Sequence, residues 1–217
     1  MKRTLVIGAS GGIGSAIVRS LPGDVVTLSR SNDGFDITDE RSIGHHLGSL
    51  DGFFDLIFVA TGALAINGAQ PEKSIGSVSA DALMDQYKTN AVGPMMVLKH
   101  SLRLLPRDER AVFAALSARV GSIGDNRMGG WHSYRAAKAG LNQLLHGASI
   151  ELKRTHRQAI VLALHPGTVE TEFTKNDGGR DKLSRDEAAR RLLDVVASRS
   201  LSDTGKFYDY SGLEIPW

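Results

Sequence analysis

The stretch TLVIGASGGIGSAIVRSL (residues 4–21) combines the two elements on which the fold depends. It starts as a short apolar run, typical of a buried strand, and continues with the apolar spacing of a helix. Between the two, Gly8, Gly12 and Gly14 follow the spacing G-x-x-x-G-x-G, a relative of the dinucleotide fingerprint G-x-G-x-x-G. Glycine lets the chain turn sharply there, so that free N–H groups at the helix start face the phosphates of a nucleotide. An ordinary glycine turn has the same pattern, but its place after the first strand favours nucleotide binding. We predict that this turn binds a dinucleotide through Gly8, Ser10, Gly11, Gly12, Ile13 and Gly14.

Beyond this stretch, short apolar runs alternate with longer helical patterns. We expect strands at residues 4–8, 24–29, 35–38, 54–62, 110–117, 158–167 and 205–210. We expect helices at residues 12–21, 80–105 and 134–153, and one more after Ser184, which forms a capping-box signature with Glu187. Strands this apolar, with helices between them, favour a parallel sheet that is covered on both faces. The sequence therefore predicts a single Rossmann-like, doubly wound α/β domain over residues 1–217, with a mostly parallel sheet of about seven strands.

The composition excludes several classes of protein. The 26 lysines and arginines against 24 acidic residues give a net charge of +2 without a basic run, so we expect no nucleic-acid partner. There is no cysteine, and the seven histidines show no metal-ligand spacing, so we predict no disulfide and no metal site. The N-terminal apolar run is too short for a signal peptide, and no run approaches the ~20 apolar residues of a membrane span. These features favour a cytoplasmic enzyme or binding protein.

The end of the second expected strand, TLSRSND (residues 27–33), bears on the choice of dinucleotide. A site for the unphosphorylated ribose usually has an acidic residue at this position, whereas an arginine suits a 2′-phosphate. Here Ser29 and Arg30 take that position. A solvated loop arginine is the alternative, but the pattern favours NADP(H), with NAD(H) possible.

Tyr134 and Lys138, in the segment SYRAAKAGL (residues 133–141), are four residues apart and share one face of the expected helix. A free tyrosine has a pKa near ~10 and is a slow proton donor at neutral pH. A lysine ammonium one turn away favours the phenolate and lowers that pKa. Two polar residues on an exposed helix face are the alternative.

Together with the glycine loop, further motifs occur in a characteristic order. They are ATG at 60–62, Asn90 in KTNAVGP, the Tyr134 and Lys138 pair, and HPGTVET at 165–171. In this order the motifs resemble those of the short-chain dehydrogenase/reductase family, over the length of the chain. The segments LSARVGSIGDNRMGGWHSYRAAKAGLN (residues 116–142) and GKFYDYSGLEIPW (residues 205–217) resemble the C-factor and sniffer-type carbonyl-reductase branch.

The resemblance implies an NADPH-dependent oxidoreductase that reduces a small-molecule aldehyde or ketone to an alcohol, or catalyses the reverse reaction. It equally allows an NADP(H)-binding signalling or regulatory protein, like C-factor, with little or no turnover. The small and apolar residues of the expected helices at 80–105 and 134–153 fit a homo-oligomer, dimer or tetramer, and packing on the sheet is the equal alternative.

The resemblance also assigns roles to residues. Tyr134 is the general acid, Lys138 lowers its pKa and holds the nicotinamide ribose, and Asn90 interrupts its helix and holds a water that leads to Lys138. The cofactor-binding residues implied are Ser29, Arg30, Asp36, Ile37, Ala60, Thr61, Gly62, Asn90, Tyr134, Lys138, Pro166, Gly167, Val169 and Thr171. Phe173 and the loop 174–182 form a candidate cover over the substrate.

One position departs from the family pattern. The family has a catalytic serine three residues before a glycine at the end of the fifth strand, and that slot falls on Ala118 in LSARVG (residues 116–121). Ser117 is one residue earlier, and neighbouring side chains of a strand point to opposite faces. We take Ser117 as the catalytic serine, with Ser122 or no serine as the alternatives.

Overall fold

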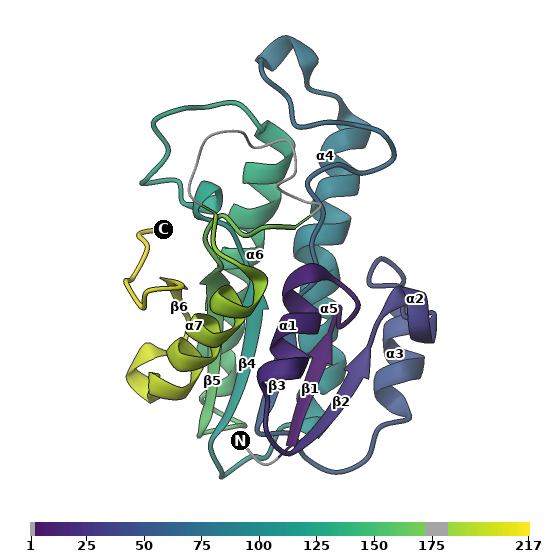
Figure 1. The fold of residues 1–217 in the computed structure, drawn as a ribbon, viewed down its shortest axis with the longest axis vertical. Coiled ribbons are helices and arrows are strands. Elements are labelled where there is room, and N and C mark those ends of the chain that lie inside the picture. Colours follow the sequence, from purple (N-terminus) through teal and green to yellow (C-terminus); the bar gives the residue numbers. More distant parts are fainter. Residues whose placement is uncertain (1–2, 172–181) are drawn as a thin grey trace.

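A single sheet of six parallel strands carries the fold of this computed structural model, which describes residues 3–171 and 182–217 (Figure 1). The strands lie in the order β2-β1-β3-β4-β5-β6. Their bounds are β1 (Arg3–Ile7), β2 (Asp24–Leu28), β3 (Leu56–Val59), β4 (Ala111–Leu116), β5 (Ala159–His165) and β6 (Lys206–Asp209). The helices are α1 (Gly12–Ser20), α2 (Arg30–Asp33), α3 (Glu40–Gly48), α4 (Ala80–Tyr87), α5 (Gly93–Ser101), α6 (His132–Leu152) and α7 (Arg185–Ser198). The predicted doubly wound α/β architecture is confirmed. Of the predicted cover at 173–182, residues 173–181 lie outside the described residues.

Two layers of helices bury the two faces of the sheet. In β4, Phe113 and Ala115 belong to a core that contains side chains of α3, α5 and α6, whereas Val112 and Ala114 belong to a core with α1 and α7. Neighbouring residues of a strand point to opposite faces, so every residue of β4 is buried in one core or the other. This explains why the strands read as continuous apolar runs rather than as alternating patterns.

The sheet has six strands in the described part of the chain, and the strand predicted at 35–38 is absent. The Asp36 carboxylate accepts hydrogen bonds from both the N–H and the hydroxyl of Thr38, each at 2.8 Å. Such a side-chain bond to a residue two positions on closes a turn and competes with strand pairing. The prediction of about seven strands was therefore one too high.

The helix predicted over 80–105 is interrupted, as expected at Asn90. It divides into α4, a π-helical stretch at Lys88–Val92, α5, and a 3₁₀ turn at Leu102–Leu104. The buried Asn90 lies in the middle of the π-helical stretch. Bulges of this kind in helices are frequent at functional sites. Ser184 caps α7 as predicted, because its hydroxyl accepts the Glu187 N–H at 3.2 Å.

The strand order reverses between β1 and β3, because the chain runs from β1 outward to β2 and then returns to the other side of β1. Ligands of open α/β sheets bind in the crevice at the carboxyl ends of strands where this order reverses. Gly8 follows β1 and Ala60 follows β3, and the Ala60 N–H donates to the carbonyl of Ile7 at 2.8 Å. The glycine loop and the ATG motif thus lie side by side at that crevice.

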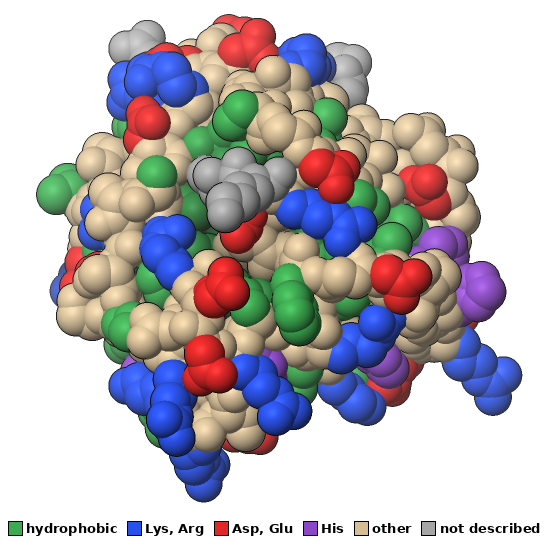
Figure 2. Space-filling model, turned by 90° about the horizontal axis from the view of Figure 1, so that it is seen from below, with side chains coloured by type: hydrophobic (Ala, Val, Ile, Leu, Met, Phe, Trp, Pro, Cys, Tyr) green, Lys and Arg blue, Asp and Glu red, His purple; other side chains and the backbone are tan. Residues whose placement is uncertain are grey.

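At the opposite end of the molecule, viewed from below in Figure 2, basic and acidic side chains are interspersed. Within the described ranges, no helix is both long enough and apolar enough to cross a membrane.

Candidate active site

The glycine turn has the backbone that its sequence demands. Gly8 has a φ of +85°, a conformation that favours glycine. A Cβ at Gly14 would lie 2.1 Å from the carbonyl oxygen of Gly8, and one at Gly12 would lie 2.7 Å from the Cγ2 of Thr171. The turn therefore tolerates glycine alone at position 14, and it brings the start of α1 next to the HPGTVET segment.

Helix α1 begins without a cap of its own. Its N-cap residue, Gly11, has no side chain to accept a hydrogen bond, and no acidic residue lies in the first turn. The first N–H groups of a helix and the positive end of its macrodipole attract anions. The residues present therefore fit the pyrophosphate of a dinucleotide.

The groove beyond this turn fits the remainder of a dinucleotide as well. The buried hydroxyl oxygen of Thr61 has no hydrogen-bond partner among the described residues. A Cβ at Gly62 would lie 3.2 Å from the Oδ1 of Asn90 and 3.4 Å from the Nζ of Lys138. A side chain at position 62 would thus press on two of the predicted catalytic residues, whereas glycine leaves the groove wall flat.

The predicted adenine end gathers positive charge. Arg30 is exposed at the start of α2, whereas the Ser29 hydroxyl is engaged in capping that helix by accepting the Asn32 N–H at 3.2 Å. The hydrogen bonds from Thr38 hold the pKa of the Asp36 carboxyl below its ordinary value, and the charges of Arg30 and Lys88 lower it further. Arg30 and Lys88 are therefore both near enough for their charges to act on Asp36.

An acidic residue is nevertheless present at the end of β2. The Asp33 carboxylate accepts the Ser29 N–H at 2.7 Å and the Ser29 hydroxyl at 3.2 Å. The acidic residue of an NAD site is expected at the position of Ser29. Asp33 comes four residues later in the sequence, but the α2 turn brings its carboxylate back to the end of β2.

Tyr134 and Lys138 are both buried on α6, with 5% and 2% of their surface exposed. The Nζ of Lys138 lies 5.8 Å from the centre of the Tyr134 ring and donates to the carbonyl of Leu116 at 2.9 Å. The two side chains therefore share one face, as the spacing predicted. Neither lies on an exposed helix face, so the alternative interpretation is wrong.

Burial shifts the pKa of both groups. It raises the pKa of the Tyr134 phenol above its ordinary value and lowers the pKa of the Lys138 ammonium to about 7. The first direction is the opposite of the predicted one, because burial removes water from around the phenol and disfavours the phenolate. A phenol with a raised pKa keeps its proton at neutral pH but gives that proton up less readily.

Asn90 connects the π-helical stretch to the segment after β3. Its side chain accepts the Ala63 N–H at 3.1 Å and donates to the Ala63 carbonyl at 2.9 Å. It also donates to the Oε1 of Gln86 at 2.6 Å, and the Gln86 amide donates to the carbonyl of Leu64 at 2.8 Å. Asn90 and Gln86 together fix the backbone that follows the ATG motif.

The hydroxyl groups of Ser117 and Ser122, the two serine candidates, both make hydrogen bonds to groups other than Tyr134. The Ser117 hydroxyl donates to the Oδ1 of Asn142 at 2.7 Å, in the buried layer between β4 and α6. The Ser122 hydroxyl donates to the carbonyl of Pro216 and accepts the Asp125 N–H. Ala118 follows Ser117 and is only partly buried. The catalytic role of Ser117 stays a prediction.

The HPGTVET segment forms the far wall of the crevice. Gly167 has a φ of +80°, and a Cβ there would lie 2.8 Å from the Tyr210 ring. Val169 is buried and pairs with Leu183, while Thr171 approaches Gly12. Burial lowers the pKa of the His165 imidazole, at the end of β5, to about 4, so this histidine is neutral. The cofactor roles of Pro166, Gly167, Val169 and Thr171 stay predictions.

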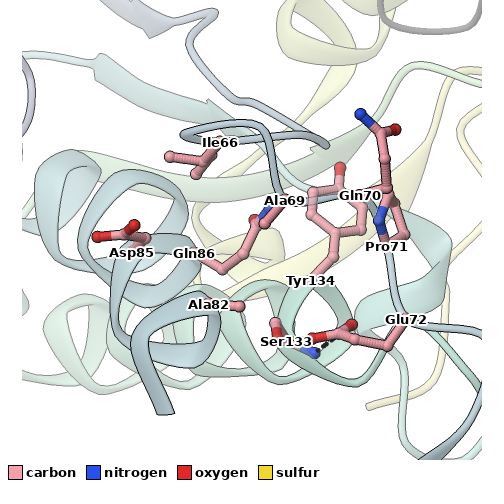
Figure 3. A pocket seen from close by; sticks show the side chains of 10 residues that line it. All are labelled: Ile66, Ala69, Gln70, Pro71, Glu72, Ala82, Asp85, Gln86, Ser133 and Tyr134. Atoms are coloured by element: carbon pink, nitrogen blue, oxygen red, sulfur yellow. Dashed lines mark hydrogen bonds between the residues drawn. The ribbon is translucent and has the colours of Figure 1, made fainter. Parts of the chain in front are cut away.

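A narrow pocket lies beside Tyr134, between α4, the start of α6 and the loop 66–72 (Figure 3). The loop residues Ala69 and Gln70 lie next to the tyrosine ring, and the Glu72 carboxylate points to Ser133. The pocket is lined by Ile66, Ala69, Gln70, Pro71, Glu72, Ala82, Asp85, Gln86, Ser133 and Tyr134. Glu72 and Gln86 were not predicted as site residues from the sequence. Gln86 could have been found, because it is four residues before Asn90 on the same helix face. No sequence motif indicates Glu72, which is 61 residues from Ser133.

Comparisons with known proteins agree with this geometry. A family model for short chain dehydrogenases matches residues 35–181. C-signal of Myxococcus xanthus is 31% identical over 145 residues, which cover 66% of this chain and 84% of that protein. The carbonyl reductase Sniffer of D. melanogaster superposes with a TM-score of 0.85 at 22% identity, over all of both chains.

A short-chain dehydrogenase/reductase from Burkholderia multivorans, solved with bound NADP, is 28% identical and has a TM-score of 0.79. The superposition covers all of this chain and 99% of that one. With more than half of its residues matched by the family model, and with the glycine turn and the Tyr134 and Lys138 pair in place, this chain belongs to the short-chain dehydrogenase/reductase family of NAD(P)-dependent oxidoreductases.

Proposed function

We propose that the protein is an NADPH-dependent oxidoreductase that reduces an aldehyde or ketone to an alcohol, or catalyses the reverse reaction. The observation that carries this proposal is that the predicted cofactor groove lies next to α6, the helix that contains Tyr134 and Lys138. A Cβ at Gly62 would lie 3.4 Å from the Nζ of Lys138, and Tyr134 lies one turn away on α6. A buried proton donor next to a dinucleotide groove is the arrangement that carbonyl reduction requires.

The preference for NADPH rests on charge. Arg30 and Lys88 both act on Asp36, so two cations adjoin the predicted adenine position. Arginine binds a phosphate through paired, charge-assisted hydrogen bonds. The bound NADP of the Burkholderia relative supports the same choice. The Asp33 carboxylate near Ser29 is the feature that leaves NADH possible.

The bound cofactor supplies the hydride. Tyr134 donates its proton to the oxygen of the carbonyl as that oxygen becomes an alkoxide. Lys138 orients the cofactor ribose and, when protonated, stabilises the phenolate that Tyr134 leaves behind. Asn90 holds the π-helical stretch against Ala63, and its role in holding a water that leads to Lys138 stays a prediction.

For the carbonyl oxygen itself, the geometry favours the alternative in which no serine orients it. Ser117 would have to break its bond to Asn142 before its hydroxyl could turn toward the substrate. Ala118, in the slot of the family serine, offers no donor. Carbonyl polarisation would then rest on Tyr134 alone.

A signalling or regulatory protein that binds NADP(H) with little turnover is the second candidate. It is favoured by the alanine at position 118 and by the similarity to C-signal. Its cofactor site would be the same, and only the chemical step would be weak.

Calorimetric titration with NADPH and NADH, followed by NADPH oxidation with a panel of aldehydes, ketones and quinones, separates the two candidates. We expect tighter binding of NADPH and oxidation with at least one carbonyl compound. Tight NADPH binding without turnover across the panel would support the signalling candidate instead. Failure of both cofactors to bind would refute both candidates. The small-molecule substrate, a dimer or tetramer, and the cytoplasmic location stay predictions.

A further inference from the structure

Helix α6 carries Tyr134 in its first turn but has no cap within its own sequence. Its N-cap residue is Trp131, which makes no side-chain cap, and the first turn has no acidic residue. The first N–H groups of a helix need partners from elsewhere, and a helix end without them frays. Tyr134 is the third residue of α6 and therefore lies in the part that would fray.

Glu72, which is 61 residues before Ser133 in the sequence, supplies the missing cap. Its carboxylate accepts the Ser133 N–H at 3.2 Å through Oε2 and the Ser133 hydroxyl through Oε1. The acceptor position matches that of an N-cap side chain, which bonds the N–H of the second or third helical residue. Glu72 has only 6% of its surface exposed, so the bonds are shielded from water.

The backbone of Glu72 adds a second point of attachment. Its carbonyl accepts the Trp131 N–H at 2.6 Å. Trp131 has a φ of 51°, in the left-handed region that is unfavourable for a non-glycine residue. One residue of the loop 66–72 thus holds both the strained entry to α6 and its first turn.

The carboxylate is charged in this setting. Burial opposes its ionisation most strongly, but the hydrogen bonds from Ser133 and from the backbone of Glu72, together with the charge of His132, outweigh burial and lower the pKa of Glu72 below its ordinary value. A negative charge at a helix N-terminus is stabilised by the macrodipole.

We propose that Glu72 is a positioning residue for the reaction: it caps α6 from the opposite wall of the pocket and so fixes the place of Tyr134. The inference rests on the proposed function for its kinetic consequence, but the cap itself does not. Because the loop 66–72 also lines the pocket, the same contact couples the pocket wall to the proton donor.

The test uses Glu72→Ala, Glu72→Gln and a matched control, Asp203→Ala, in the full chain with NADPH. In Glu72→Gln the amide oxygen of the new side chain can still accept from Ser133, so this variant keeps the geometry and removes the charge. Asp203 makes an equally dense set of bonds, to Ser200 and Tyr208, beside β6 and away from the pocket. Hydrogen exchange of residues 131–137 and the split between kcat and the KM for NADPH are measured.

In Glu72→Ala we expect exchange at 131–137 about tenfold faster and kcat lower by about tenfold to a hundredfold, with the KM for NADPH within about twofold. Glu72→Gln restores both readouts to within about threefold of the wild type. Asp203→Ala lowers thermal stability without changing exchange at 131–137 or kcat. If Glu72→Ala does not fold, Ser133→Ala, which removes one of the two donors, takes its place with a smaller change in the same direction.

Unchanged exchange at 131–137 in Glu72→Ala would overturn the proposal, as would equal acceleration in Asp203→Ala. An unchanged kcat in a Glu72 variant with faster hydrogen exchange at residues 131–137 would also overturn the proposal. The exchange comparison needs no turnover, so a protein without carbonyl reductase activity would refute the proposed function while leaving the cap measurable.

Discussion

Helices α1 and α6 both begin without a side-chain cap or an acidic residue in the first turn, yet the chain treats the two N-termini differently. At α1 the N-cap residue is Gly11, which has no side chain to cover the first N–H groups. At α6 a glutamate from a distant loop accepts the Ser133 N–H and hydroxyl. Both helices thus lack a cap from their own sequence. The start of α1 is left available to an anionic ligand, whereas the start of α6 is capped by the distant glutamate.

The difference follows from what each helix has to do. In the proposed function helix α1 accepts the phosphates of the cofactor, and a carboxylate in its first turn would repel them. In the same proposal helix α6 holds Tyr134 in place, and the charged Glu72 cap does so without a ligand. Changes at the two helix starts should therefore affect different quantities: cofactor affinity at α1, and the rate of proton transfer at α6.

The largest effect is expected at α1 from Gly14→Ala. The new Cβ would lie 2.1 Å from the Gly8 carbonyl oxygen, so the turn must open and the phosphate site is lost. We expect no calorimetric signal for NADPH at concentrations that saturate the wild type. Gly147→Ala is the matched control, because a Cβ there meets nothing within 4 Å. Wild-type affinity in Gly14→Ala would show that the turn does not bind the cofactor.

A smaller effect is expected beside α6 from the two serine-segment variants. Ala118→Ser places a hydroxyl in the family slot and should raise kcat by up to about a hundredfold, the lower end of the range for an oxyanion donor. Ser117→Ala removes the bond to Asn142 and should cost about 1 kcal/mol of stability, with kcat within about threefold of the wild type. A hundredfold loss of kcat in Ser117→Ala would instead make Ser117 the catalytic serine that the sequence predicted.

The smallest effect concerns stability at high pH. Lys138 has a pKa of about 7 in the folded chain and an ordinary value near 10.5 when unfolded. Between these values the unfolded chain binds more protons, so this group adds stability as the pH rises from about 7 to 10. The free energy of unfolding of the wild type minus that of Lys138→Met should increase over this range, by at most about 1.4 kcal/mol per pH unit. Urea unfolding at pH 8 and pH 9, between which the expected change is at most about 1.4 kcal/mol, measures it, and a flat or falling difference would contradict the burial argument.

The sequence predicted the sheet well because each strand is a continuous apolar run with both faces buried. It failed at residues 35–38, where the pattern is apolar enough for a strand but the Asp36 side chain closes a turn on Thr38. It located Tyr134 and Lys138 correctly, since their contact depends only on helical spacing. It could not predict that burial would raise the pKa of Tyr134, because burial depends on the whole fold.

Glu72 illustrates the same limit. Its contact with Ser133 joins a loop to a helix 61 residues later, and no local pattern at either residue indicates it. Asp33 is a similar case, because the α2 turn returns its carboxylate to the end of β2. Side chains whose role depends on such returns of the chain become visible only in the structure.

The most direct measurement of the central claim is the rate of NADPH oxidation in a single turnover by the wild type and by Tyr134→Phe, with the best carbonyl compound of the panel. Phenylalanine keeps the ring and removes the proton. The account predicts that Tyr134→Phe binds NADPH with a Kd within about twofold of the wild type and oxidises it at least about a hundredfold more slowly. Equal rates in the two proteins would contradict the assignment of Tyr134 as the proton donor.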